Sequence, residues 1–178
     1  MNRREFLLAG AGTLAAAPPA KKTVAAIVTE YRYYSHADVI VGRILEGYTP
    51  NGARVKPRTC IVSMYTDQVA EKDMSRDLAA KHGFRIYPTV AQALTLGGDS
   101  LAVDAVLLVG EHGSYPHNEK GQKLYPRFEL YQRIIEVFRR SGRAVPLFFD
   151  KHLSYSWTKA KMMYDEAREL KIPFMAGS

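Results

Sequence analysis

The chain has 178 residues, of which 47% are hydrophobic and 24% charged, a composition typical of a globular domain with one sizeable core. Its formal net charge of +7 comes from lysines and arginines that alternate with acidic residues along the chain. They form no basic stripe in the sequence, so the charge does not predict nucleic-acid binding. The single cysteine, Cys60, excludes an internal disulfide and lies in an apolar run that predicts a buried, unreactive side chain.

The first twenty residues have the composition of an export signal. Two adjacent arginines, Arg3 and Arg4, precede a run of small apolar residues at 9–17 that is too short to span a bilayer. Paired arginines before such a run resemble the twin-arginine signal. We therefore expect residues 1–20 to direct export to the periplasm, and residues 21–178 to form the mature domain without a membrane span.

The segments after the signal alternate between strand-like and helix-like patterns. Residues 23–29 form a β-branched and alanine-rich run without polar alternation, which is typical of a strand covered on both faces. Apolar residues at helical spacing then predict a helix over 36–47. A polar stretch with two prolines, residues 48–58, predicts a loop before a second strand at 59–65.

The rest of the chain continues this alternation. A helix predicted over 73–82 opens with Asp73 as its N-cap and ends before Gly83. The later predicted elements are strands at 84–87, 103–109, 145–149 and 172–175 and helices at 90–96, 127–140 and 156–170. Six strands that alternate with helices predict a Rossmann-like, doubly wound parallel α/β sheet with helices on both faces. The largely apolar runs at 24–28 and 103–109, which lack polar alternation, are predicted to be its central strands.

Segments near the later strands resemble a known family. The sequence VPLFFDKHLS at 145–154 resembles the strand ending in Glu-Lys-Pro-Leu of the glucose-fructose oxidoreductase and inositol dehydrogenase family. Residues 172–177 resemble the family's next strand, and residues 78–83 and 103–106 match in the same order, so the resemblance covers about residues 23–178. It implies the NAD(P)-binding Rossmann half of an oxidoreductase that acts on a sugar-like or polyol-like small molecule.

Two features depart from the family pattern. Its nucleotide-binding turn is Gly-x-Gly-x-x-Gly, because side chains would keep the backbone amides away from the pyrophosphate. Residues 29–36 of this chain, TEYRYYSH, contain no glycine, and Tyr31, Tyr33 and Tyr34 each place a ring where glycine would leave space. Glu30 would repel a phosphate that Arg32 and the amides near Ser35 attract. The chain also ends soon after the sixth predicted strand, so we expect the family's C-terminal substrate domain to be absent from it.

The resemblance implies roles for individual residues. Lys151 matches the family's lysine near the nicotinamide and the reacting hydroxyl, Asp150 replaces the motif's glutamate, and His117 takes the place of a loop histidine near the cofactor. We expect these three to be the catalytic residues. The residues expected to contact NAD or NADP are Thr29, Arg32, Ser35, Asp67 and Asn118. Asp67 follows the second strand, where a carboxylate can accept a hydrogen bond from a ribose hydroxyl.

Two other functions stay open. The glycine-free turn favours a non-catalytic binding or scaffold module that has lost the nucleotide. Alternatively, the loop residues Glu111, His112, His117 and Glu119 are of the types that bind zinc or iron, as a metal-dependent hydrolase would require. Their spacing matches no motif of fixed geometry, so we assign no metal ligands. A homo-oligomeric state also stays open.

Overall fold

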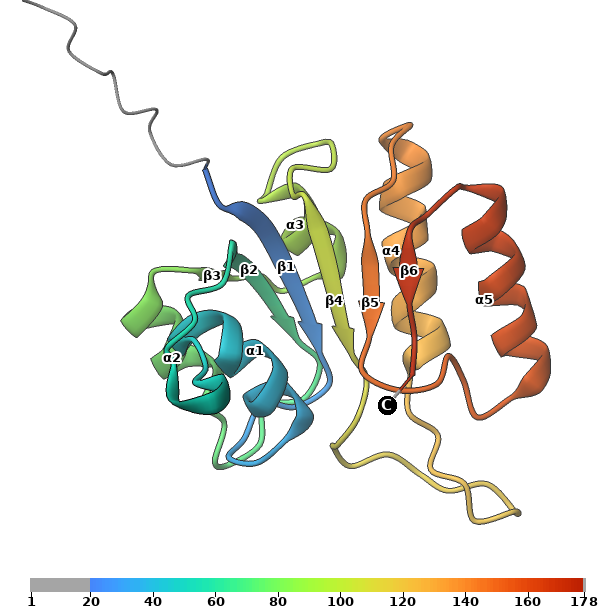
Figure 1. Cartoon of the computed structure of the whole chain (residues 1–178). Helices are drawn as coiled ribbons and strands as arrows, with labels where there is room; N and C mark the ends of the chain where they lie inside the picture. The colour runs from blue at the N-terminus through green and yellow to red at the C-terminus, as the bar shows by residue number, and fades with distance from the viewer. Residues whose placement is uncertain (1–19, 178) are drawn as a thin grey trace, which may run out of the picture.

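Six strands form one sheet in the order β3-β2-β1-β4-β5-β6 (Figure 1). The computed structural model describes residues 20–177, so the predicted export signal, apart from its last residue, lies outside the described part of the chain. The elements are β1 (Lys22–Val28), α1 (His36–Glu46), the short 3₁₀ helix η1 (Pro50–Gly52), β2 (Thr59–Thr66), α2 (Ser75–His82), β3 (Arg85–Ile86), α3 (Val90–Thr95), β4 (Ala105–Val109), α4 (Arg127–Arg140), β5 (Leu147–Phe149), α5 (Trp157–Glu169) and β6 (Phe174–Met175). All neighbouring strands are parallel, and this strand order is that of a Rossmann-type sheet, which confirms the predicted fold class.

β1 and β4 occupy the centre of the sheet, as their apolar runs predict. Every residue of β1 from Val24 to Val28 is buried. Alternate side chains point to opposite faces, so that Val24, Ala26 and Val28 join one core cluster while Ala25 and Ile27 join the other. Because both faces are covered, neither face of the strand requires polar residues, which explains the continuous apolar sequence.

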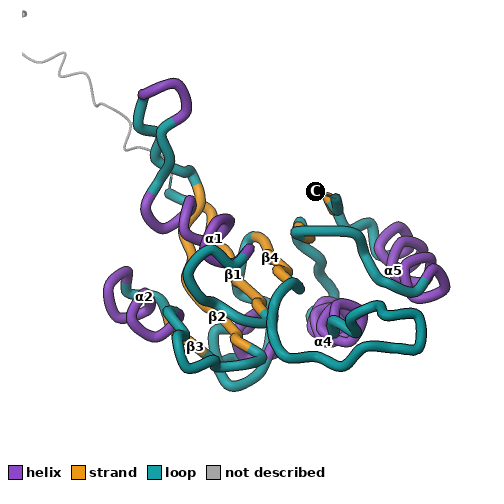
Figure 2. The backbone as a smooth tube through the Cα atoms, turned by 90° about the horizontal axis from the view of Figure 1, so that it is seen from below, coloured by secondary structure: helices purple, strands orange, loops and turns teal. Residues whose placement is uncertain are grey.

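Helices cover both faces of the sheet, as Figure 2 shows. α1 and α2 pack on one face, and α3, α4 and α5 lie on the other. α4 is amphipathic, and the apolar residues of its buried stripe recur at helical spacing: Leu130, Ile134, Val137 and Phe138. On the face that carries α1, an apolar hollow over β4, β5 and β6 is lined in part by Leu107, Phe148 and Met175.

Side-chain caps and glycines fix several of the predicted helix ends. Ser35 caps α1 by accepting a hydrogen bond from the Asp38 amide, and Thr89 does the same for α3 through the Gln92 amide. Gly83 ends α2 in the left-handed conformation with a φ of 74°. Local capping chemistry therefore determines where these helices start and stop.

Some details differ from the sequence-based predictions. Asp73 does not cap α2, because its carboxylate accepts a hydrogen bond from the Ser75 hydroxyl at 2.7 Å and the helix begins at Ser75 itself. Cys60 is only half-buried, and its thiol lies 3.7 Å from the Lys22 carbonyl oxygen. Within residues 20–177, no helix has the length and hydropathy needed to cross a bilayer.

Candidate functional site

The candidate site lies where the carboxyl ends of β1, β4 and β5 meet. The chain leaves β1 and β4 toward opposite sides of the sheet, and such a switch point is where open α/β sheets bind ligands. Thr29 joins the two loops there, since its amide donates to the Val109 carbonyl at 3.1 Å and its hydroxyl donates to the Glu111 carbonyl at 2.6 Å. The loops after β1 and β4 are thus held together at their bases.

The turn after β1 is filled by its own side chains. Tyr31, which we expected to crowd a phosphate, is fully buried in the core instead, while Tyr33 and Tyr34 are exposed. The carboxylate of Glu30 forms an ion pair with Arg32 at 2.6 Å. The Arg32 amide donates to the Ser35 hydroxyl at 3.2 Å, so part of the donor capacity of this turn is already used within it.

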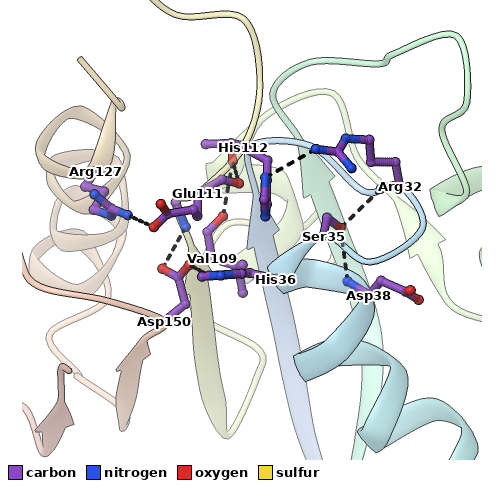
Figure 3. Close-up of polar contacts among 11 residues, drawn as sticks. Arg32, Ser35, His36, Asp38, Val109, Glu111, His112, Arg127 and Asp150 are labelled. Carbon is purple, nitrogen blue, oxygen red and sulfur yellow. Dashed lines mark hydrogen bonds and ion pairs between the residues drawn. The ribbon is translucent and has the colours of Figure 1, made fainter. Parts of the chain in front are cut away.

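A histidine–carboxylate pair connects the start of α1 with the end of β5 (Figure 3). His36 Nδ1 lies 2.9 Å from Oδ2 of Asp150, and the Asp150 side chain is almost completely buried. The other oxygen of this carboxylate, Oδ1, accepts a hydrogen bond from the Gly110 amide at 3.0 Å. Asp150 therefore holds α1, the loop after β4 and the end of β5 in one arrangement.

An ion pair between a buried arginine and a half-buried glutamate lies beside this carboxylate. Arg127, only 3% exposed, donates to Oε2 of Glu111 at 2.5 Å. The arginine comes from the first residue of α4, and it crosses so close to Gly110 that a Cβ at that glycine would lie 2.6 Å from its Cγ. The Nε of Arg127 is buried and has no hydrogen-bond partner among the described residues.

Two histidines near the ion pair have weakened basicity. His112 adopts a φ of 71°, its Nδ1 lies 3.4 Å from a guanidinium nitrogen of Arg32, and its ring meets that of His36 edge-on at 5.0 Å. Burial lowers the pKa of His112, and the neighbouring His36 and Arg32 lower it further. Burial likewise lowers the pKa of His152, with a further contribution from Arg127. Both imidazoles thus favour the neutral form.

Asp67 lies at the end of β2, where Rossmann folds place the carboxylate that binds a ribose. Its two oxygens accept hydrogen bonds from the Tyr65 and Tyr115 hydroxyls, both at 2.7 Å. Burial, together with the Asp67 carboxylate, raises the pKa of Tyr115, which keeps that hydroxyl a donor. The carboxylate is therefore oriented by two protonated phenols.

The sequence-predicted residues lie in two places. Asp150 and the turn residues lie at the ends of the central strands, and Lys151 follows directly after Asp150. His117 and Asn118 lie farther along the loop after β4, where Asn118 closes a tight turn by accepting from the Gln122 amide at 3.0 Å. The exposed His117 forms a bridge with Lys123 across the same loop, so the structure shows these two residues in loop-closing roles.

Sequence reasoning missed two residues of the site, His36 and Arg127. Arg127 has a detectable signal, because it occupies the same face of α4 as Leu130 and Ile134 and is a charged residue on an otherwise buried stripe. His36 directly follows the capping Ser35 and carries no comparable signal, since its partner Asp150 is 114 residues away in the sequence.

The carboxyl edge of the sheet matches only some of the features that bind a dinucleotide. The switch point and Asp67 match the places where such a cofactor meets a Rossmann sheet. The turn after β1 does not match, because it offers the Glu30 carboxylate and bulky side chains where glycine amides normally approach the pyrophosphate. A preformed pyrophosphate cradle is therefore missing from this arrangement of the turn.

Comparisons with known proteins agree on the fold. No family model and no curated protein matches the sequence. Among solved structures, scyllo-inositol dehydrogenase from Lactobacillus casei is 9% identical with a TM-score of 0.55, over 88% of this chain and 36% of that one. GenD2 from gentamicin A biosynthesis, solved with NAD, is 17% identical with a TM-score of 0.55, over 91% and 36% of the two chains.

An NAD binding oxidoreductase from Klebsiella pneumoniae is 19% identical with a TM-score of 0.52, over 89% of this chain and 35% of that one. The chain thus spans little more than a third of the length of these structures, and identities this low show the fold alone. The fold that the family resemblance implied is confirmed: the chain has the fold of the Rossmann-type part of these oxidoreductases.

Proposed function

We propose that the chain is the nucleotide-binding part of an NAD- or NADP-dependent oxidoreductase that acts on a sugar-like or polyol-like small molecule. The observation that carries the proposal is the cluster of polar side chains at the switch point between β1 and β4, in a sheet with the Rossmann strand order. The similar structures support it, since they include an inositol dehydrogenase and a biosynthetic protein solved with NAD.

In this proposal, two neighbouring residues at the end of β5 have different roles. Asp150 is buried and already accepts hydrogen bonds at both oxygens, so it positions the loops around the site. Lys151 is half-buried, and among the described residues no ion pair holds its ammonium group. It is therefore free to donate a proton or a hydrogen bond to a substrate hydroxyl.

A second candidate function is a binding or scaffold module without a nucleotide. The Glu30–Arg32 ion pair favours it, because the arginine that would attract a phosphate is already neutralised at 2.6 Å by a largely buried carboxylate. The two candidates differ in one measurable property, which is affinity for a pyrophosphate-containing cofactor.

Calorimetric titration of the full-length protein with NAD and NADP tests the proposal. We expect saturable binding of one of the two, and tighter binding by Glu30→Gly, because this change removes a negative charge and a side chain from the turn after β1. Glu169→Gly, at the exposed end of α5, removes the same charge elsewhere and should leave the affinity unaltered. No binding at millimolar cofactor by either protein would favour the non-catalytic module.

We further propose that the protein is exported to the periplasm by the twin-arginine route. Arg3 and Arg4 before the apolar run support this proposal. Replacement of both by lysine should leave the precursor in the cytoplasm, as cell fractionation would show. Unchanged export of the double variant would contradict the assignment.

We also propose that the mature protein forms a homo-oligomer. Light scattering on the mature protein would detect it.

A further inference from the structure

We propose that His36, Glu111 and Asp150 bind one divalent transition-metal ion, such as Zn²⁺ or Mn²⁺, at the carboxyl edge of the sheet. One ligand atom of each residue lies within 4.8 Å of the other two. The three residues come from the start of α1, the loop after β4 and the end of β5, and Figure 3 shows their side chains converging. This site was not predicted from the loop at 111–119, since it shares only Glu111 with that set.

The two carboxylates are oriented as metal-binding carboxylates usually are. Oδ1 of Asp150 accepts a hydrogen bond from the Gly110 amide at 3.0 Å, and Oε2 of Glu111 accepts a hydrogen bond from the Arg127 guanidinium at 2.5 Å. Each carboxylate is thus held in place by a hydrogen bond from a protein donor. Hydrogen bonds of this kind fix the direction of metal-binding side chains and are part of the design of such sites.

A hydrogen bond between His36 and Asp150 accounts for only part of the arrangement. Two carboxylates converge there although like charges repel, and Arg127 neutralises one of them. A divalent cation that replaces the proton between His36 Nδ1 and Asp150 Oδ2 would attract both carboxylates and so remove their mutual repulsion. His36 Nδ1 and Asp150 Oδ2 are 2.9 Å apart, and all three ligand atoms lie within 4.8 Å of one another. Ligand atoms that share one tetrahedral ion are about 3.3 Å apart, so small side-chain movements would bring the three atoms to binding distance.

The ligand types identify the class of ion. One imidazole nitrogen with two carboxylate oxygens suits Zn²⁺, Mn²⁺ or Fe²⁺, whereas Mg²⁺ and Ca²⁺ prefer oxygen ligands alone. Three protein ligands leave a coordination position for water or for an oxygen of a small molecule. His112 stands beside His36, with ring centroids 5.0 Å apart, and its buried Nε2 has no hydrogen-bond partner among the described residues.

Calorimetric titration of the chelator-treated, full-length protein with ZnCl₂ and with MnCl₂ tests this site. We expect saturable binding of one ion per chain, and His36→Ala should weaken it at least tenfold. His36 is the ligand whose removal disturbs the fold least, because its side chain is 31% exposed. Glu111→Gln, whose amide oxygen can still accept from Arg127, should weaken binding as well.

His82→Ala is the matched control. His82 also pairs with a carboxylate, at 2.8 Å from Glu46, but on α2 and without a second convergent carboxylate among the described residues. This variant should bind the ion as the unaltered protein does, and circular dichroism should show that all variants are folded. Wild-type-like affinity in both His36→Ala and Glu111→Gln, or no binding by the unaltered protein, would overturn the proposal. Its failure would leave the cofactor titration unaffected, since that experiment contains no metal.

Discussion

Removal of the Asp150 carboxylate should destabilise the domain by about 3 kcal/mol, since Asp150 joins α1, the loop after β4 and the end of β5. In Asp150→Ala the Gly110 amide loses a buried charge-assisted hydrogen bond and its only acceptor among residues 20–177, a change that costs about 2 kcal/mol. The His36 contact adds about 1 kcal/mol at most, because that imidazole is 31% exposed and can turn to water. The cost therefore comes mainly from the buried amide.

Urea unfolding followed by circular dichroism measures this cost, with an unchanged slope to show that the unfolded state is the same. Asp150→Asn is the informative control, because its amide oxygen can still accept from Gly110, and it should lose only about 1 kcal/mol. Equal destabilisation by the two variants would mean that the charge matters more than the hydrogen bond to Gly110. A loss below about 0.5 kcal/mol in Asp150→Ala would refute the positioning role.

Three further predictions follow from the same edge of the sheet. Lys151→Ala should reduce turnover or ligand binding with little change in melting temperature, since the Lys151 ammonium forms no ion pair among the described residues. A large loss of stability with unaltered binding would show that Lys151 has a structural role. Gly110→Ala should cost about 2 kcal/mol in urea unfolding, because the new Cβ would lie 2.6 Å from the buried Arg127 side chain, and an unchanged midpoint would contradict this packing. The pKa of His112 is lowered in the folded protein, so the unfolded chain takes up the proton first and the free energy of unfolding falls as the pH drops below about 6.5. His112→Asn should therefore reduce the difference in melting temperature between pH 7.5 and pH 5. A difference as large as that of the unaltered protein would exclude His112 as its source.

The fold was largely predictable from local patterns in the sequence. α4 begins and ends where its amphipathic pattern predicts, and the apolar runs of β1 and β4 correctly identify the central strands. Strand ends were less accurate. Predicted residues 145–149 became β5 at Leu147–Phe149, since Pro146 has no amide to donate and only its carbonyl pairs, with the Val106 amide.

The site was less predictable because its contacts join distant parts of the chain. Asp150 was identified through the family resemblance, but its partner His36 lies 114 residues away, and no local pattern links them. Tyr31 shows the same limit. It was expected to crowd the turn after β1, whereas its ring lies in the core cluster that includes buried residues of α1. Tertiary packing, which local patterns do not contain, decides which side chains of such a turn face a ligand.

Fluorescence of reduced nicotinamide tests the proposed function most directly. The purified full-length protein, titrated into NADH and separately into NADPH, should enhance the emission of one of them and reach saturation, because a nicotinamide ring held at the switch point leaves water. An excess of the matching oxidised cofactor should reverse the enhancement. A protein that is folded by circular dichroism and leaves the emission of both reduced cofactors unchanged would contradict the assignment as a nucleotide-binding oxidoreductase domain.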